Sequence, residues 1–248
     1  ANARLLAQGE ADFAMMQNDI AAYAREGQEM FDEKIDSIVG VAALYPEHVQ
    51  VVVRADSGIN SIADLKGKRV AIGALGSGTK ANAVQVLEAY GLSESDLGKV
   101  EHLDPSGSRD YLQDGQVDAG FFTFGVGMAS LLDLASMAEI RLIPVEGAAR
   151  DRLMAKHPFY RKAVIPAGAY GEDTPSDVPT VSVMATLVCR EDVPEETVRK
   201  VLAGVLGNLE EFRKGHKRLE AVNAADAQAN LSLPAHPGAA AYYKAHVK

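Results

Sequence analysis

Residues Arg69 to Leu92, RVAIGALGSGTKANAVQVLEAYGL, contain the signals that decide the fold. A short apolar run, Val70 to Ile72, is closed by Gly73 and predicts a buried strand. The turn Gly76-Ser77-Gly78-Thr79 follows, and apolar residues then recur at helical spacing up to a stop at Tyr90-Gly91. The stretch therefore predicts a strand, a glycine-rich turn and a helix, which is the repeating unit of an α/β fold.

The turn also predicts a binding site for an anion. Backbone N–H groups and the positive end of the helix dipole attract negative charge at such a helix start. Ser77 is followed three residues later by Lys80, and Thr79 by Asn82, so no acidic side chain satisfies the first turn. A ligand carboxylate or phosphate could bind there. The alternative, in which Ser77 and Thr79 are ordinary N-caps and Lys80 is solvated, stays open.

Two nucleotide-binding motifs come close to this turn. Gly73 stands at the Walker A distance from Gly78, but Thr79 and Lys80 follow in reversed order. A dinucleotide fingerprint fits from Gly76 to Ala81, with Asp104 for a ribose, yet it begins beyond the end of the strand. An α/β enzyme that uses Gly76–Ala81 as a phosphate loop is therefore the rival hypothesis.

Composition excludes several classes of protein. The 248 residues carry a net charge of -9, whereas nucleic-acid binding needs a basic surface. No apolar run approaches the roughly 18 residues of a membrane span, so we expect no membrane insertion. Cys189 is the only cysteine, which excludes an internal disulfide and a thiolate zinc cluster.

Catalytic and metal-binding patterns are missing from the sequence. No Gly-x-Ser-x-Gly elbow occurs, and the six histidines show no metal-ligand spacing. His102 and Asp104 form the nearest pair, which the end of a surface strand explains better. Cys189 lies in an apolar strand, where cysteine is usually an inert hydrophobe. We therefore expect no catalytic residue, metal or cofactor, and a site that holds its ligand without converting it.

Strands and helices alternate along the chain, which predicts mostly parallel sheets flanked by helices. Separate strands are expected at 38–44 and 49–53, and a loop at 158–179. Asp192 and Glu195 predict a capping box at the start of a C-terminal helix.

Two lobes follow from this order. Residues 1–54 and 180–248 are expected in one lobe and 55–179 in the other, with a hinge and a cleft between them. Ligands of open α/β sheets bind beyond the carboxyl ends of strands. That rule groups the polar strand ends into one predicted site, formed by Gln17-Asn18, Tyr45, Gly76–Thr79 and Thr123-Phe124-Gly125.

Three long segments resemble a known family: 43–79 with LYPE and GKRVAIGALGSGT, 115–135 with FFT, and 157–192 with IPAGAY. They are similar to the TAXI branch of TRAP-transporter solute receptors, which are extracytoplasmic binding proteins of bacteria and archaea. The resemblance implies a type II periplasmic-binding fold, a periplasmic location and delivery of the ligand to a membrane permease. It also implies a small carboxylate ligand such as glutamate, glutamine or a related dicarboxylate. A receptor for an ABC-type permease shares the fold and stays an alternative.

The resemblance also implies roles for individual residues. Hydroxyl and N–H groups of the glycine-rich turn would hold the ligand carboxylate through charge-assisted hydrogen bonds. Two aromatic residues would wall the pocket, and an asparagine at position 18 or 82 would bind a polar tail. The predicted pocket residues are Gln17, Asn18, Tyr45, Ser77, Gly78, Thr79, Asn82, Thr123, Phe124 and Gly125.

The beginning of the sequence differs from this family. Members normally start with a signal peptide, a first strand and a glycine- and tyrosine-rich loop that contributes to the pocket. Here the chain opens at Ala1 in the middle of a pattern, on a helix end that leads into a strand. We expect a processed or truncated chain in which the first strand and helix of one lobe are missing.

Overall fold

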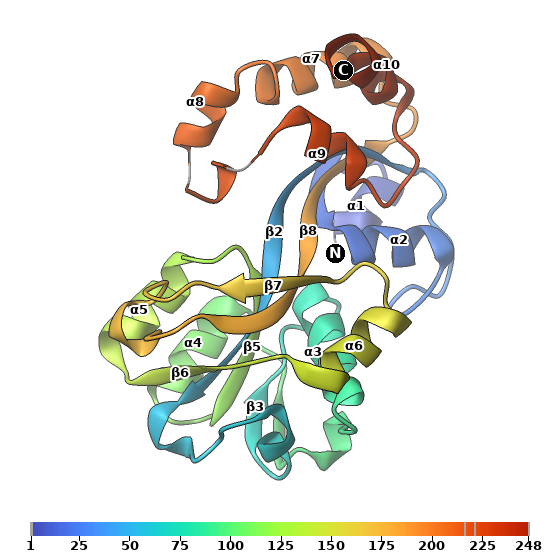
Figure 1. Cartoon of the computed structure of the whole chain (residues 1–248). Helices are drawn as coiled ribbons and strands as arrows, with labels where there is room; N and C mark the ends of the chain where they lie inside the picture. Colours follow the sequence, from blue (N-terminus) through green and yellow to red (C-terminus); the bar gives the residue numbers. More distant parts are fainter. Residues whose placement is uncertain (1, 216, 221, 248) are drawn as a thin grey trace. The chain divides into compact units, whose positions relative to one another are not determined.

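A computed structural model describes residues 2–215, 217–220 and 222–247 (Figure 1). The chain divides into two compact units, the first formed by Ala1–Pro46 and Val183–Lys248 and the second by Glu47–Ser182. Strands β2 (Ile38–Arg54) and β8 (Val178–Arg190) each contribute residues to both units. The boundary between the two units thus falls inside these two strands, and not at residues 54 and 180, where the sequence predicts it.

The second unit contains a mixed sheet. β3 pairs in parallel with β4 and with β5, while β2 runs antiparallel to both β5 and β6, and β7 runs antiparallel to β8. The expectation of a mostly parallel sheet is therefore wrong. The long strands β2 and β8 run antiparallel to the neighbours named here, and among these pairs only those of β3 with β4 and with β5 are parallel. The other strands are β3 (Arg69–Ala71), β4 (Lys99–Glu101), β5 (Ala119–Phe124), β6 (Ile140–Ile143) and β7 (Arg161–Ile165).

Helices cover both faces of β5 in this unit. Phe122 and Phe124 pack with Leu112 and Leu131, which belong to α4 and α5. Because side chains alternate along a strand, Thr123 points to the opposite face. That face lies beside α3, which contacts β5 and α6, and Figure 1 shows α3 and α4 on opposite sides of β5. The helices are α3 (Gly78–Ala89), α4 (Pro105–Gln113), α5 (Ala129–Met137) and α6 (Gly147–Lys156), with short 3-10 turns at Ala55–Ser57, Ile62–Leu65, Glu94–Asp96 and Gly171–Asp173.

The first unit packs helices around the other ends of β2 and β8. β1 (Phe13–Gln17) pairs antiparallel with β8. Its core joins Val41 of β2 and Cys189 of β8 to an apolar stripe on α7 and to Tyr243 of α10, as the helical spacing predicts. The helices are α1 (Asn2–Ala7), α2 (Asn18–Glu26), α7 (Glu195–Val205), α8 (Leu209–Lys214), α9 (Ala224–Ala229) and α10 (Pro237–His246), with a 3-10 turn at Lys217–Leu219.

Local expectations differ from the structure in four places. The strands expected at 38–44 and 49–53 are one continuous strand, β2. The segment 158–179 contains β7 and a 3-10 turn, and α6 before it was not predicted. The apolar stripe after Pro194 is divided between α7 and α8. The capping box is absent, because Pro194 is the N-cap of α7 and Asp192 instead accepts a 2.8 Å hydrogen bond from Arg190.

Candidate ligand-binding site

The turn between β3 and α3 is held tightly by two glycines. Gly73 has φ of 92°, and a Cβ there would lie 2.9 Å from both the Lys80 nitrogen and the Thr79 Cβ. The Ser77 N–H donates to the Ala74 carbonyl at 3.0 Å, and Gly76 has φ of 72°. Both glycines adopt backbone angles that other residues rarely adopt. The start of α3 is therefore fixed directly against the end of β3.

The first turn of α3 leaves backbone donors unsatisfied. The Ser77 hydroxyl accepts a 3.1 Å hydrogen bond from the Lys80 N–H, so Ser77 is an ordinary N-cap. Lys80 itself pairs with Glu94 at 3.3 Å. In the part of the chain that the structure describes, the N–H groups of Gly78 and Thr79 have no acceptor, and the first turn has no acidic residue. Ser77 is thus an ordinary N-cap, which is the alternative that the sequence left open. The N–H groups of Gly78 and Thr79 remain available to bind an anion.

Thr123 brings a second kind of donor to this region. It lies on β5 three residues after Gly120, which pairs with Ala71, the last residue of β3. The carboxyl ends of parallel strands share one edge of a sheet, so Thr123 and the start of α3 occupy the same edge and the same face. The Thr123 side chain is 7% exposed, and its hydroxyl has no hydrogen-bond partner. We call the N–H groups of Gly78 and Thr79 together with the Thr123 hydroxyl the anion seat.

An unsatisfied buried hydroxyl is a costly feature. Mutational data put the penalty at about 1–3 kcal/mol. Native proteins satisfy most buried polar groups, so an exception needs a physical explanation. A ligand oxygen bound at the anion seat would supply the missing acceptor.

The two residues after Thr123 lie at the same strand end but contribute differently. The Phe124 ring is buried on the α4 and α5 face, with its centroid 5.7 Å from that of Phe122. Phe124 and Thr123 point to opposite faces, so their side chains cannot line the same surface. Gly125 is buried at the start of the turn that follows β5.

A buried hydrogen-bond network that the sequence analysis missed fixes this strand end. Gln50 donates to the Phe124 carbonyl at 3.1 Å, and the Tyr170 hydroxyl donates to Gln50 Oε1 at 2.6 Å. The same hydroxyl accepts from the Gly127 N–H at 3.1 Å. No local motif announces these contacts, because Gln50 and Tyr170 lie 74 and 120 residues from their partners.

Asn82 lies on the other side of the first turn of α3. Its side chain is fully buried and donates to the Tyr160 hydroxyl at 2.8 Å, which in turn donates to Gln85 Oε1 at 2.7 Å. This network attaches α3 to the segment that precedes β7. A direct role of Asn82 in ligand binding stays a prediction, and we leave this residue out of the anion seat.

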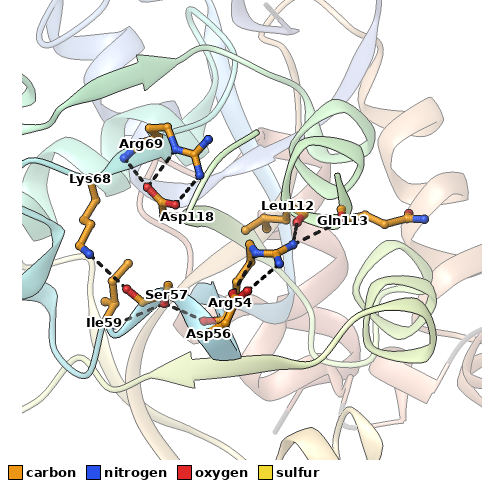
Figure 2. A network of polar contacts seen from close by, with 9 residues as sticks. All are labelled: Arg54, Asp56, Ser57, Ile59, Lys68, Arg69, Leu112, Gln113 and Asp118. Carbon is orange, nitrogen blue, oxygen red and sulfur yellow. Dashed lines mark hydrogen bonds and ion pairs between the residues drawn. The ribbon is translucent and has the colours of Figure 1, made fainter. Parts of the chain in front are cut away.

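Formal charges cluster at the opposite end of β3 and β5 (Figure 2). Asp118 accepts hydrogen bonds from the Arg69 side chain at 2.6 and 3.2 Å and from the Arg69 N–H at 2.9 Å. These bonds hold the pKa of the Asp118 carboxyl below its usual value. Arg54 pairs with Asp56 and also donates to the Leu112 carbonyl at 3.1 Å, near the end of α4. This network ties the amino ends of the strands together, at the end of the sheet opposite to the anion seat.

The other predicted site residues belong to the first unit. Gln17 ends β1, is 8% exposed, and its Oε1 has no hydrogen-bond partner. Asn18 begins α2, and its side chain accepts from the Met184 N–H at 2.9 Å. Tyr45 is half-buried, with the Arg218 guanidinium 5.4 Å from its ring centroid. Arg218 is 173 residues further along the chain, so the sequence offered no signal for this cation–π contact.

The remaining candidates have structural roles. Asp104 caps α4 by accepting a 2.7 Å hydrogen bond from the Gly107 N–H. Cys189 is buried in the core of the first unit, and burial raises the pKa of its thiol to about 12. Across residues 2–215, 217–220 and 222–247, no three His, Cys, Asp or Glu side chains gather where they could bind a metal ion. None of the helices in these ranges is long and apolar enough to cross a membrane.

Comparison with known proteins assigns the chain to a family. The NMT1-like family model matches residues 1–246. The chain belongs to the NMT1-like family. The family thus covers both units of the NMT1-like chain, the anion seat included.

Solved structures with the same fold include a protein named as a periplasmic binding protein. The NMT1-like chain is similar to the periplasmic aliphatic sulphonate binding protein SsuA from Escherichia coli, with 18% identity and a TM-score of 0.53. The match covers 97% of this chain and 64% of SsuA, so the chain spans less than two thirds of that protein. PhnD1 from Prochlorococcus marinus, in complex with methylphosphonate, matches with 14% identity and a TM-score of 0.57, over 88% and 74% of the two chains. XAC2383 from Xanthomonas citri, bound to ATP, matches with 12% identity and a TM-score of 0.58, over 100% and 84%.

These matches confirm the α/β fold of two-lobe periplasmic binding proteins for the NMT1-like chain. They do not single out the TAXI branch. The comparisons show the NMT1-like family and the fold of two-lobe periplasmic binding proteins.

Proposed function

We propose that this NMT1-like protein is an extracytoplasmic receptor that binds a small organic anion and passes it unchanged to a membrane permease. The observation that carries the proposal is the anion seat. It combines two N–H groups at the positive end of α3 with the buried, unsatisfied hydroxyl of Thr123. Every group of the seat can donate a hydrogen bond, and the first turn of α3 contains no acidic residue, so a negatively charged ligand fits its chemistry.

The ligand we propose is a small carboxylate such as glutamate, glutamine or a related dicarboxylate, and the transporter is of the TRAP type. The resemblance of the long segments around the glycine-rich turn to TAXI receptors supports both. The fold relatives support an anion more generally, since the names of two of them mention a sulphonate and a methylphosphonate. One is also named as periplasmic, which agrees with the proposed location.

A receptor of an ABC-type permease is the second candidate. The description of the matching family, NMT1-like, names neither permease class, so this candidate stands beside the first. Co-purification with membranes that contain one or the other permease separates the two. Retention by a TRAP permease supports the first proposal, and retention by an ABC permease replaces it.

The nucleotide-dependent enzyme is supported less well. Asp104, expected to bind a ribose, uses its carboxylate to cap its own helix. The glycines at 76 and 78 also begin well after β3, which ends at Ala71. A thermal-shift assay with NAD and ATP tests this class, and a clear stabilisation by NAD at micromolar concentration would revive it.

Calorimetry tests the receptor proposal directly. We expect at least one of glutamate, glutamine, 2-oxoglutarate and small dicarboxylates to bind. Thr79→Ala keeps the backbone N–H of the anion seat but removes the Thr79 hydroxyl, and we expect it to weaken that binding by about 1–3 kcal/mol through the loss of one charge-assisted hydrogen bond. Thr197→Ala is the matched control, because Thr197 is an exposed threonine in the first turn of α7. If no compound of the panel binds, the carboxylate proposal fails. If Thr79→Ala and Thr197→Ala bind equally well, the Thr79 hydroxyl does not contact the ligand.

A further inference from the structure

Leu75 is a solvent-exposed apolar residue in the turn that leads into the anion seat, three residues before Gly78. It is 72% exposed, more than any other large hydrophobic residue among those that the structure describes. It lies two residues before Ser77, the N-cap of α3. Single exposed hydrophobic residues are common on protein surfaces, so exposure alone does not indicate that Leu75 binds a ligand. Its place in the turn before α3 and the fixed backbone of that turn are the relevant features.

The backbone holds Leu75 in one place. The Ser77 N–H donates to the Ala74 carbonyl, and Gly76 has a positive φ, which fits a type II turn with Leu75 at its first corner. That corner accepts most residues, so the turn itself does not require a leucine. A Cβ on Gly76 would meet no atom within 4 Å, so the space beside Gly76, between Leu75 and the N-cap, is open.

We infer that Leu75 contacts the hydrocarbon part of the ligand, so that the bound solute is an organic anion with an apolar chain next to its charged group. This inference rests on the proposed function and narrows its substrate class. The anion seat binds the charged group, and the leucine removes part of the attached chain from water. A fully polar ligand would gain nothing from a leucine at this corner.

Straight-chain carboxylates of increasing length, from acetate to hexanoate, test the inference by calorimetry on the full chain. For the wild type, each methylene group that reaches Leu75 raises the affinity about three- to fourfold. Leu75→Ala removes most of this gain and weakens the binding of the longest member about tenfold, while acetate binds as it does to the wild type. Met137→Ala is the matched control, because Met137 is 62% exposed at the end of α5 and away from the seat. This control keeps the full dependence on chain length.

Two results overturn the inference without affecting the proposed function. One is binding that does not depend on chain length. The other is an equal loss for acetate and hexanoate in Leu75→Ala, which shows that Leu75 contacts the protein and not the ligand. Failure of these carboxylates and of the glutamate panel to bind at all overturns the proposed function and this inference together. Melting temperatures of the variants establish that each is folded, which the high exposure of both side chains leads us to expect.

Discussion

Replacing Thr123 by valine should change stability and binding in opposite directions. The substitution keeps the shape of the side chain and removes a hydroxyl that is buried and without a partner. In the free protein it removes a desolvation penalty, so we expect a gain of about 1–2 kcal/mol in the free energy of unfolding. For a chain of this size, that gain corresponds to about 2–8 °C in melting temperature. In the complex it removes a hydrogen bond to a charged group, which is worth about 1.5–3 kcal/mol, or about 10- to 150-fold in affinity.

Thr180→Val is the matched control for this experiment. Thr180 is 1% exposed in the same unit, but its hydroxyl donates to the Val49 carbonyl. The same substitution there removes a buried hydrogen bond, and we expect it to lower the free energy of unfolding by about 1–2 kcal/mol. The chain has no tryptophan, so unfolding is best followed by circular dichroism and binding by calorimetry. If Thr123→Val destabilises the free protein as Thr180→Val does, and leaves every affinity unchanged, the reasoning about the anion seat is wrong.

Three further variants test the parts that position the seat. Tyr170→Phe removes both hydrogen bonds of the hydroxyl at the end of β5, and we expect urea denaturation to show a loss of about 1–3 kcal/mol. Gly73→Ala forces a Cβ to 2.9 Å from the backbone of α3, so it should lower the melting temperature more than Gly76→Ala, which has a similar φ but open space; equal effects would contradict the close approach. Asp118→Asn should cost about 1–2 kcal/mol at pH 7, because Arg69 holds the pKa of this carboxyl low and the pair stabilises the fold while Asp118 is ionised. The difference in the free energy of unfolding between Asp118→Asn and the wild type should become smaller as the pH falls below about 4, because Asp118 is then protonated in the wild type. A difference that becomes larger in acid would contradict this assignment.

Local structure around the anion seat could be predicted from the sequence, because its signals are local. Glycines at 73 and 76, the serine N-cap and the apolar spacing of α3 lie within one short stretch, and the structure forms the strand, turn and helix that they predict. The direction of strand pairing was not predictable in this way. It depends on β2 and β8, which pair with segments far away in the sequence.

The same difference between local signals and contacts over long sequence distances applies to individual site residues. The sequence grouped Thr123 with Phe124, but only a known sheet face shows that the hydroxyl and the ring point in opposite directions. The resemblance implies that Asn82 binds ligand, and only the fold shows that its amide donates to Tyr160 in the interior. Gln50 and Tyr170 were missed because each is an ordinary residue until the fold brings them together.

Electron density at the anion seat, in crystals of the protein purified without denaturation or added ligand, tests the central claim most directly. We predict density for a small anion, with an oxygen atom within hydrogen-bond distance of the Gly78 and Thr79 N–H groups and of the Thr123 hydroxyl. A Thr123 hydroxyl bonded to the protein itself, with the first turn of α3 closed by one of the chain's own side chains, would contradict it.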